Sequence, residues 1–126
     1  MSLALTVRDY IASQIVTLIG DTNLFHGGFP DDAPDISVNV EGLPGGSENE
    51  SGIISTGIQI IARALDYEGA ESWAYAVYNE LANQPGFDGM GSEDVKYCEV
   101  LQMPYFAMKD ARNRYLFITT FLMRKE

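Results

Sequence analysis

The sequence predicts an α+β fold, with an antiparallel or mixed sheet of about four strands flanked by two helices. Three observations predict it. Two segments place apolar residues at helical spacing. Four others show the alternation, or the continuous apolar character, of strands. Their order along the chain is α-β-β-α-β-β, which is typical of helices packed on a mainly antiparallel sheet.

The first helix is expected over residues 3–19. Its apolar residues recur at helical spacing and form one stripe: Ala4, Val7, Ile11, Ile15, Leu18 and Ile19. Ser2 is a suitable N-cap, and Gly20 with Asp21 is expected to end the helix. Residues 25–34 contain two glycines and two prolines, so we expect no regular structure there.

Two strands follow, over residues 36–41 and 53–65. The first alternates cleanly, with Ile36, Val38 and Val40 on one face and Ser37, Asn39 and Glu41 on the other. The second places Ile54, Ile58, Ile60 and Ala62 on one side. The segment Gly42–Gly52 between them is glycine-rich and acidic, which is typical of a mobile loop. The two strands are therefore expected to form an antiparallel hairpin with a long tip.

The second helix is expected over residues 67–83. Its apolar stripe consists of Ala70, Trp73, Ala74, Val77 and Leu81. Asp66 is placed to cap its N-terminus, and Asn83–Gly86 is expected to end it. Trp73, the largest residue of the stripe, is expected to anchor the core.

A final hairpin is expected from Tyr97–Met108 and Arg114–Arg124, joined by residues 109–113. In its last strand both faces are apolar, with Tyr115, Phe117 and Phe121 on one and Leu116, Ile118 and Leu122 on the other. Such a strand is typically buried on both sides. Helices are expected to cover one face of the sheet, and either a helix or a neighbouring subunit the other.

Composition narrows the class of protein. The 126 residues fit a single domain, over 1–126, with one hydrophobic core. No apolar run is long enough to span a bilayer, and the first residues lack the basic region of a signal peptide. Cys98 is the single cysteine, so no intrachain disulfide forms. We therefore expect a cytoplasmic protein, or one in a particle assembled in a cytoplasm.

Charge is distributed unevenly along the chain. The net charge is −10, which disfavours ordinary DNA binding because a duplex would be repelled. Residues 21–95 contain fourteen acidic residues and one basic residue, whereas residues 96–126 contain six basic and three acidic ones. A protein with one acidic and one more basic region is suited to head-to-tail packing against copies of itself, although plain solubility explains the charge equally well.

Few groups could perform catalysis. His26 is the single histidine, so a nucleophile–base pair would join it to Cys98 or a serine. His26 lies beside two glycines in an expected loop and Cys98 lies in an expected strand, which favours structural roles. No lysine follows Gly45–Ser47 as in a phosphate loop, and the aspartates of residues 31–35 lack the spacing of a calcium loop. We expect no enzyme, cofactor or metal site.

Three stretches of the sequence carry a family resemblance. The first, Phe29–Val38, places prolines and aspartates directly before the first predicted strand. The second, Ile60–Ala70, contains the end of a strand, an arginine, a tyrosine and the start of a helix. The third, Met103–Tyr115, is a hairpin with a proline, aromatic residues and an aspartate. In this order they resemble the minor capsid or tail-terminator proteins of long-tailed bacteriophages, over most of residues 23–126. Where that family often has glycine in the last turn, this chain has Asn113, which tolerates the same left-handed backbone.

The resemblance implies a structural virion protein. It implies a ring, expected to be hexameric, that caps the phage tail tube and joins it to the head connector or stopper protein. Its partners would be copies of itself, the tail tube protein and that connector, while DNA passes through the channel without specific binding. The protein would lie in the tail or neck of a virion assembled in the host cytoplasm, away from membranes. A head-side connector or stopper protein is the alternative, followed by a small-molecule enzyme.

A ring requires heterologous contacts, in which one surface of a copy meets a different surface of the next. We hypothesise that charged residues make these contacts: Arg112, Arg114 and Lys109 in the final hairpin, and Asp31, Asp32, Glu48 and Glu50 in the acidic region. We also expect Gly42–Gly52 to become ordered on meeting a tail or connector partner. If Glu48 and Glu50 point into the channel, they would repel DNA and let it pass.

Overall fold

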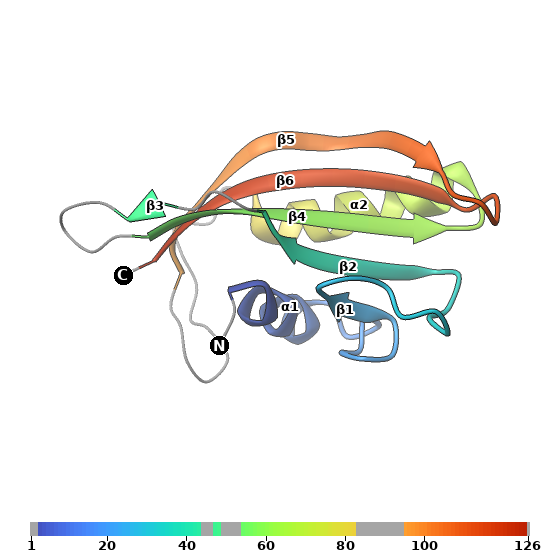
Figure 1. The fold of residues 1–126 in the computed structure, drawn as a ribbon, viewed down its shortest axis with the longest axis horizontal. Coiled ribbons are helices and arrows are strands. Elements are labelled where there is room, and N and C mark those ends of the chain that lie inside the picture. The colour runs from blue at the N-terminus through green and yellow to red at the C-terminus, as the bar shows by residue number, and fades with distance from the viewer. Residues whose placement is uncertain (1–2, 44–46, 49–53, 83–94, 126) are drawn as a thin grey trace.

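The computed structural model describes residues 3–43, 47–48, 54–82 and 95–125. Its elements, in chain order, are α1 (Leu3–Gln14), β1 (Leu24–His26), β2 (Ser37–Gly42), β3 (Ser47–Glu48), β4 (Ile54–Ala64), α2 (Tyr67–Leu81), β5 (Val95–Lys109) and β6 (Tyr115–Lys125). Figure 1 shows them as one curved sheet with α2 against its back and α1 beside β1 and β2. The α+β fold with two helices is confirmed.

The sheet is mixed and has more strands than predicted. Its order is β1-β2-β4-β6-β5, and β3 pairs with β4 outside this path. β1 runs parallel to β2, and the other pairs are antiparallel. The prediction of about four strands is wrong in number because it lacks β1 and β3. These strands have three and two residues, too few to show a period of two in the sequence.

The hydrophobic core lies between the helices and one face of the sheet. Val38, Ala62 and Phe117 share one row across β2, β4 and β6, and Ile58 and Phe121 are register partners further along. All five are almost fully buried. The helices add Leu3, Ala4, Val7 and Ile11 from α1 and Ala70, Ala74, Val77 and Leu81 from α2 to the same cluster. Both helices therefore pack on the same face.

The opposite face of the sheet carries no helix among the described residues, and we call it the helix-free face. Its first two rows across β4, β6 and β5 consist of Arg63, Leu116 and Met108, and of Ile61, Ile118 and Tyr105. Leu116 and Ile118 are only half-buried. The expectation that β6 is buried on both sides is therefore not met within the chain, because both helices lie on the other side.

α1 is shorter than the predicted helix and ends at Gln14. The side chain of Asn23 accepts a hydrogen bond from the Ile19 N–H at 2.7 Å and donates one to the Thr17 carbonyl at 2.9 Å. These bonds satisfy backbone groups that a longer helix would have paired internally, so they stabilise a turn instead. We call residues 15–23 the α1–β1 turn.

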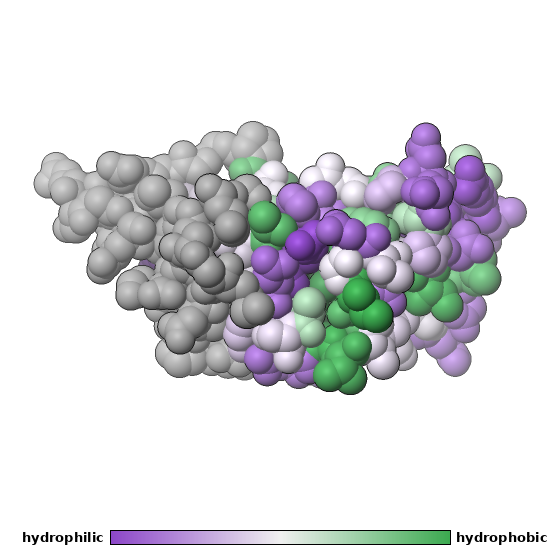
Figure 2. Space-filling model, turned by 90° about the horizontal axis from the view of Figure 1, so that it is seen from below, coloured by the Kyte–Doolittle hydropathy of each residue, from purple (hydrophilic) through white to green (hydrophobic). Residues whose placement is uncertain are grey.

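The α1–β1 turn presents apolar side chains to solvent. Val16 is 85% exposed and Ile19 is 56% exposed, whereas Leu18 is buried in the core. Figure 2, which views the molecule from the α1 and β1 side, shows a hydrophobic patch among polar atoms. The predicted stripe of residues 3–19 is therefore split, with its first part in the core and part of its second part at the surface.

α2 follows its prediction closely. Asp66 is the N-cap, and its side chain accepts a hydrogen bond from the Gly69 N–H at 3.2 Å. Ala70, Ala74 and the rest of the predicted stripe are buried, with the exception of Trp73, which is partly buried at the edge of the core. Trp73 is therefore not the core anchor, because β6 already fills the centre with its own phenylalanines.

Several predictions fall on residues outside the described part. These are the Ser2 cap, the helix stop at residues 83–86, and most of the Gly42–Gly52 loop. Within that loop, Ser47 and Glu48 form β3, paired with Ser55 and Ile54. The final hairpin is confirmed as β5 and β6, with bounds within two residues of those expected.

Candidate functional site

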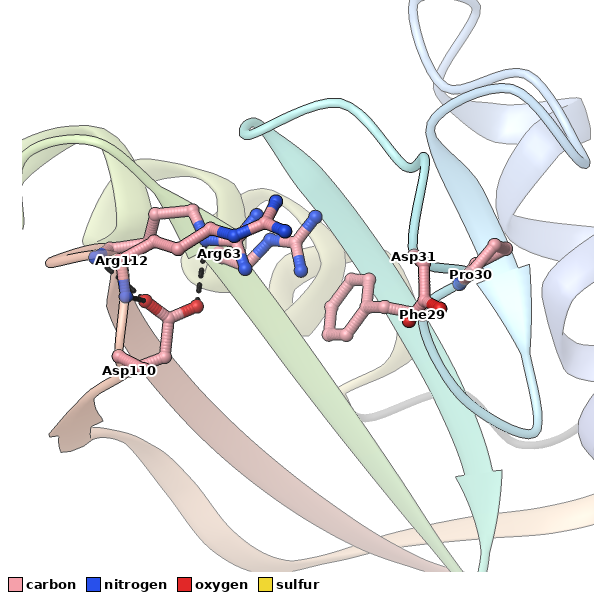
Figure 3. Close-up of a pocket in the computed structure, with 8 residues that line it drawn as sticks. Phe29, Pro30, Asp31, Arg63, Asp110 and Arg112 are labelled. Atoms are coloured by element: carbon pink, nitrogen blue, oxygen red, sulfur yellow. Dashed lines mark hydrogen bonds and ion pairs between the residues drawn. The ribbon is translucent and has the colours of Figure 1, made fainter.

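A hollow of about 240 Å³ opens at the end of the sheet where β2 begins and β4 ends. It lies between the loop that follows β1 and the turn that joins β5 to β6 (Figure 3). We call it the guanidinium hollow, and its lining residues are Phe29, Pro30, Asp31, Arg63, Asp110, Ala111, Arg112 and Arg114. Three arginines and two aspartates thus meet around one opening.

Asp110 organises the turn between β5 and β6. Its Oδ1 accepts hydrogen bonds from the backbone N–H of Arg112 at 2.9 Å and of Arg114 at 3.0 Å. Its backbone closes the same turn, because its N–H donates to the Arg114 carbonyl at 2.9 Å. Asn113 completes the turn with a φ of 60°, the left-handed conformation expected for it. The turn is therefore fixed by one side chain.

Asp110 and Asp35 hold the side chain of Arg114. Its Nε donates to Asp110 Oδ2 at 2.7 Å, and its Nη1 donates to Asp35 Oδ1 at 3.2 Å. Burial alone would raise the pKa of Asp110, but the hydrogen bonds from Arg114 and from the Arg112 N–H outweigh it and lower that pKa overall. Arg114 itself is only 8% exposed. Its charge is therefore used within the chain.

Arg63 forms the floor of the hollow and is differently placed. Its Nη2 donates to the Pro34 carbonyl at 2.6 Å and its Nε to the Asp35 carbonyl at 3.3 Å. Its guanidinium carbon lies 4.2 Å from the centre of the Phe29 ring, in a cation–π contact. Arg63 is 5% exposed, yet none of the ion pairs among the described residues includes it. Burial, and then the nearby charge of Arg114, lower the pKa of the Arg63 guanidinium.

The predicted contact residues fall into three groups. Arg112, Lys109, Asp31 and Asp32 are exposed, and of these Arg112 and Asp31 line the hollow together. Arg114 also lines it but is buried and paired, which the sequence did not indicate. In the third group, Glu48 belongs to β3, and Glu50 lies outside the described residues. Four of the seven predicted contact residues thus lie at one end of the sheet, either lining the hollow or next to the turn between β5 and β6: Arg112, Arg114, Lys109 and Asp31.

A second exposed surface adjoins the hollow. Five of the ten large hydrophobic side chains exposed among the described residues lie on β5, and we call them the β5 surface: Leu101, Met103, Tyr105, Phe106 and Met108. Tyr105 and Met108 are on the helix-free face, whereas Phe106 lies on the helix side, against the rings of Tyr67 and Phe117. β5 is also the last strand of the sheet path, and β6 is its single partner among the described strands. An exposed apolar edge strand is the kind of surface that natural proteins cover or protect.

The residues considered for catalysis do not come together. His26 lies exposed on β1 and Cys98 is buried on β5, at opposite ends of the strand order. Burial raises the pKa of the Cys98 thiol to about 12, so the thiol is protonated at neutral pH. Among the described residues, no group of three histidine, cysteine or acidic side chains is placed to hold a metal ion. No helix in this part of the chain is long and apolar enough to cross a membrane.

Comparisons with known proteins identify the fold. No family model matches the sequence, and no curated protein matches it. The structure is similar to a chain in the virion of a native gene transfer agent particle, with a TM-score of 0.65. The two chains are 14% identical, and the match covers 99% of this chain and 95% of that one. They therefore share their fold over almost their whole lengths.

The sequence alone did not predict the buried residues that form the base of the hollow. Arg63 and Phe29 lie 34 positions apart and Asp35 and Arg114 lie 79 apart, so no local pattern links them. One signal was available, because Arg63 is the single basic residue of residues 21–95. A lone arginine within a strand otherwise suited to the core indicates a buried charge that needs specific partners.

Proposed function

We propose that this chain is a structural virion protein that assembles into a ring and acts as a tail terminator. The ring would cap the phage tail tube and join it to the head connector. The observation that carries the proposal is the fold shared over 99% of the chain with a virion chain. It agrees with the family that the sequence motifs resemble.

The exposed surfaces of the chain support assembly. The β5 surface places five large apolar side chains at the edge of a sheet, and the helix-free face beside it has half-buried Leu116 and Ile118. Covering apolar area of this kind stabilises association by about 25 cal/mol for each Å² removed from water. The α1–β1 turn offers a second, separate apolar surface. Two different surfaces are what a heterologous ring contact requires.

A head-side connector or stopper protein is the second candidate. It would also form a ring. The fold comparison fits it equally, because the similar chain is described only as part of a virion, without its place in that virion. The two candidates differ in what the ring binds. A terminator binds the end of a tail tube, whereas a head-side protein binds the portal side of the neck.

The first experiment is the solution mass by light scattering, across protein concentration and salt. A hexamer, or a monomer–hexamer equilibrium, supports the proposal. If the protein is monomeric, purified tail tubes are added and the tube ends are examined by electron microscopy. A ring on one tube end supports a terminator. Rings that bind portal complexes and leave tube ends bare would favour the head-side candidate, and a chain that binds neither would contradict both.

A further inference from the structure

Two of the three guanidinium groups of the hollow, those of Arg63 and Arg112, form no ion pair among the described residues, against one unpaired lining carboxylate, Asp31. Arg114 is neutralised by Asp110 and Asp35, both within 3.2 Å. Among the described residues, Arg63 donates to two carbonyl oxygens and lies over the Phe29 ring, and the side chain of Arg112 is exposed at the mouth (Figure 3). A buried guanidinium is usually paired with a carboxylate, because desolvating the charge is costly without one. The guanidinium groups of Arg63 and Arg112 are therefore suited to receive a further carboxylate.

The position of the hollow indicates which anion. Arg63 lies on the helix-free face, in the same row as Leu116 of β6 and Met108 of the β5 surface. A protein that covers this end of β5 would therefore also cover the hollow. On the proposed function that protein is a neighbouring copy, so the anion would be one of its exposed carboxylates.

The α1–β1 turn has the matching chemistry. Val16 and Ile19 are exposed there, and the side chain of Asp21 is 80% exposed on the same turn. Asp21 Oδ1 accepts a hydrogen bond from Arg8 at 2.8 Å. The turn thus presents two apolar side chains beside a carboxylate, and the hollow presents two guanidinium groups beside the β5 surface.

We propose that the guanidinium hollow of one copy binds Asp21 on the α1–β1 turn of the next copy, while Val16 and Ile19 pack on the β5 surface. This inference rests on the proposed function, since it assigns the contact within the ring. The two surfaces lie on different sides of the molecule, one on the helix-free face and one beyond the β1 edge. The contact is therefore heterologous and propagates from copy to copy.

The test uses two charge reversals, Arg112→Glu and Asp21→Arg. Each variant alone places like charges at every contact, so we expect association to be weakened about tenfold or more at each one. When the two variants are mixed, copies that alternate around a ring meet opposite charges at every contact. Mixing should therefore restore assembly that neither variant shows alone. Light scattering measures the mass in all three samples.

Matched controls carry the same charge changes elsewhere. Arg124→Glu lies at the far end of β6, and Glu68→Arg lies in the first turn of α2. Both are expected to assemble like the unmodified protein. Because Asp21 has a φ of 64°, Asp21→Asn serves as a variant that tolerates this backbone. It removes the charge, and with it the ion pair to Arg8, but keeps an oxygen that can accept from Arg8. It should weaken association less than Asp21→Arg does.

The outcomes separate this inference from the proposed function. If both reversals assemble like the controls, or if mixing restores nothing, the contact assigned here is wrong while the ring stands. If the unmodified protein forms no ring, alone or on tail tubes, the proposed function fails and the contact fails with it. Restoration on mixing supports both.

Discussion

At the scale of single residues, the turn around Asp110 is the most strongly determined part of the site. One carboxylate accepts two backbone hydrogen bonds and one from a guanidinium, and these bonds lower its pKa. A carboxyl group whose pKa is lower in the folded protein than in the unfolded chain stabilises the folded protein. This stabilisation is greatest at a pH where the group is ionised in both the folded and the unfolded protein. Its contribution is present above the unfolded pKa of about 3.9 and is lost as pH falls through the folded pKa.

We predict that Asp110→Asn lowers the free energy of unfolding by about 1–3 kcal/mol at pH 7, because the turn loses a charged acceptor. The difference from the unmodified protein should shrink steadily below about pH 4, where the carboxyl of the unfolded chain becomes protonated. Urea unfolding at pH 7, 5 and 3 measures it.

Asp32→Asn is the control, since it removes the same charge from an exposed residue of another loop. It should change stability little at any of these pH values. A difference between Asp110→Asn and the unmodified protein that is equal at pH 7 and pH 3 would show that the lowered pKa of Asp110 does not contribute to stability.

The residue scale also shows what the sequence could not predict. Arg112 and Arg114 have the same chemistry and lie two positions apart, so the sequence treats them alike. In the structure Arg112 is exposed and Arg114 is buried, because Asp35 from a distant loop reaches only the second. Tertiary contacts between such distant positions decide which arginine remains available to a partner.

At the scale of elements, long periodic segments were predictable and short or turning ones were not. α2 and β6 have fifteen and eleven residues, and their patterns are unbroken over that length. β5 also has fifteen residues and was predictable from its length and its turn, although its register with β6 shifts at four places. α1 ends early because one side chain, Asn23, captures backbone groups of the turn. The spacing of apolar residues in the sequence carries no information about such a hydrogen bond. The helical spacing therefore continues past the residue at which the helix ends.

The start of α2 provides a prediction at this scale. A Cβ at Gly69 would collide with Oδ1 of Asp66, the atom that caps the helix. Alanine has the higher helix propensity, by up to about 1 kcal/mol in a helix interior. Loss of the cap costs about 1 kcal/mol, which opposes that gain. We therefore expect Gly69→Ala to give no increase in stability, and Asp66→Ala to lower the free energy of unfolding by about 1 kcal/mol.

A double-mutant cycle isolates the collision. In the Asp66→Ala background no cap remains to be displaced, so adding Gly69→Ala should stabilise the protein through helix propensity alone. Thermal or urea unfolding of the four proteins gives the coupling. If Gly69→Ala has the same effect with and without Asp66, the cap and the glycine act independently and this explanation fails.

At the scale of the whole molecule, charge and apolar surface act in opposite directions. Copies that each carry a net charge of −10 repel one another, whereas the β5 surface and the α1–β1 turn favour association. Added salt screens repulsion between the copies but also weakens exposed charge pairs. Because the charge repulsion opposes the apolar attraction, two copies are expected to associate only where the β5 surface of one meets the α1–β1 turn of the other.

The β5 surface makes the last prediction. Tyr105 and Met108 are 43% and 53% exposed on the helix-free face, so replacing both by serine removes little from the core of the single chain. We expect the free energy of unfolding to change by less than about 1 kcal/mol. Ring formation measured by light scattering should require at least about tenfold more protein, because each contact loses apolar area.

Ile36→Ser is the matched control, since Ile36 is 47% exposed on the loop before β2 and outside both proposed surfaces. It removes a comparable apolar side chain and should assemble like the unmodified protein. Equal loss of assembly in the control and the double variant would mean that general surface hydrophobicity drives association. If the unmodified protein, the double variant and the control assemble equally, β5 is not part of the interface. A subunit contact that covers Tyr105 and Met108 would be weakened by their loss.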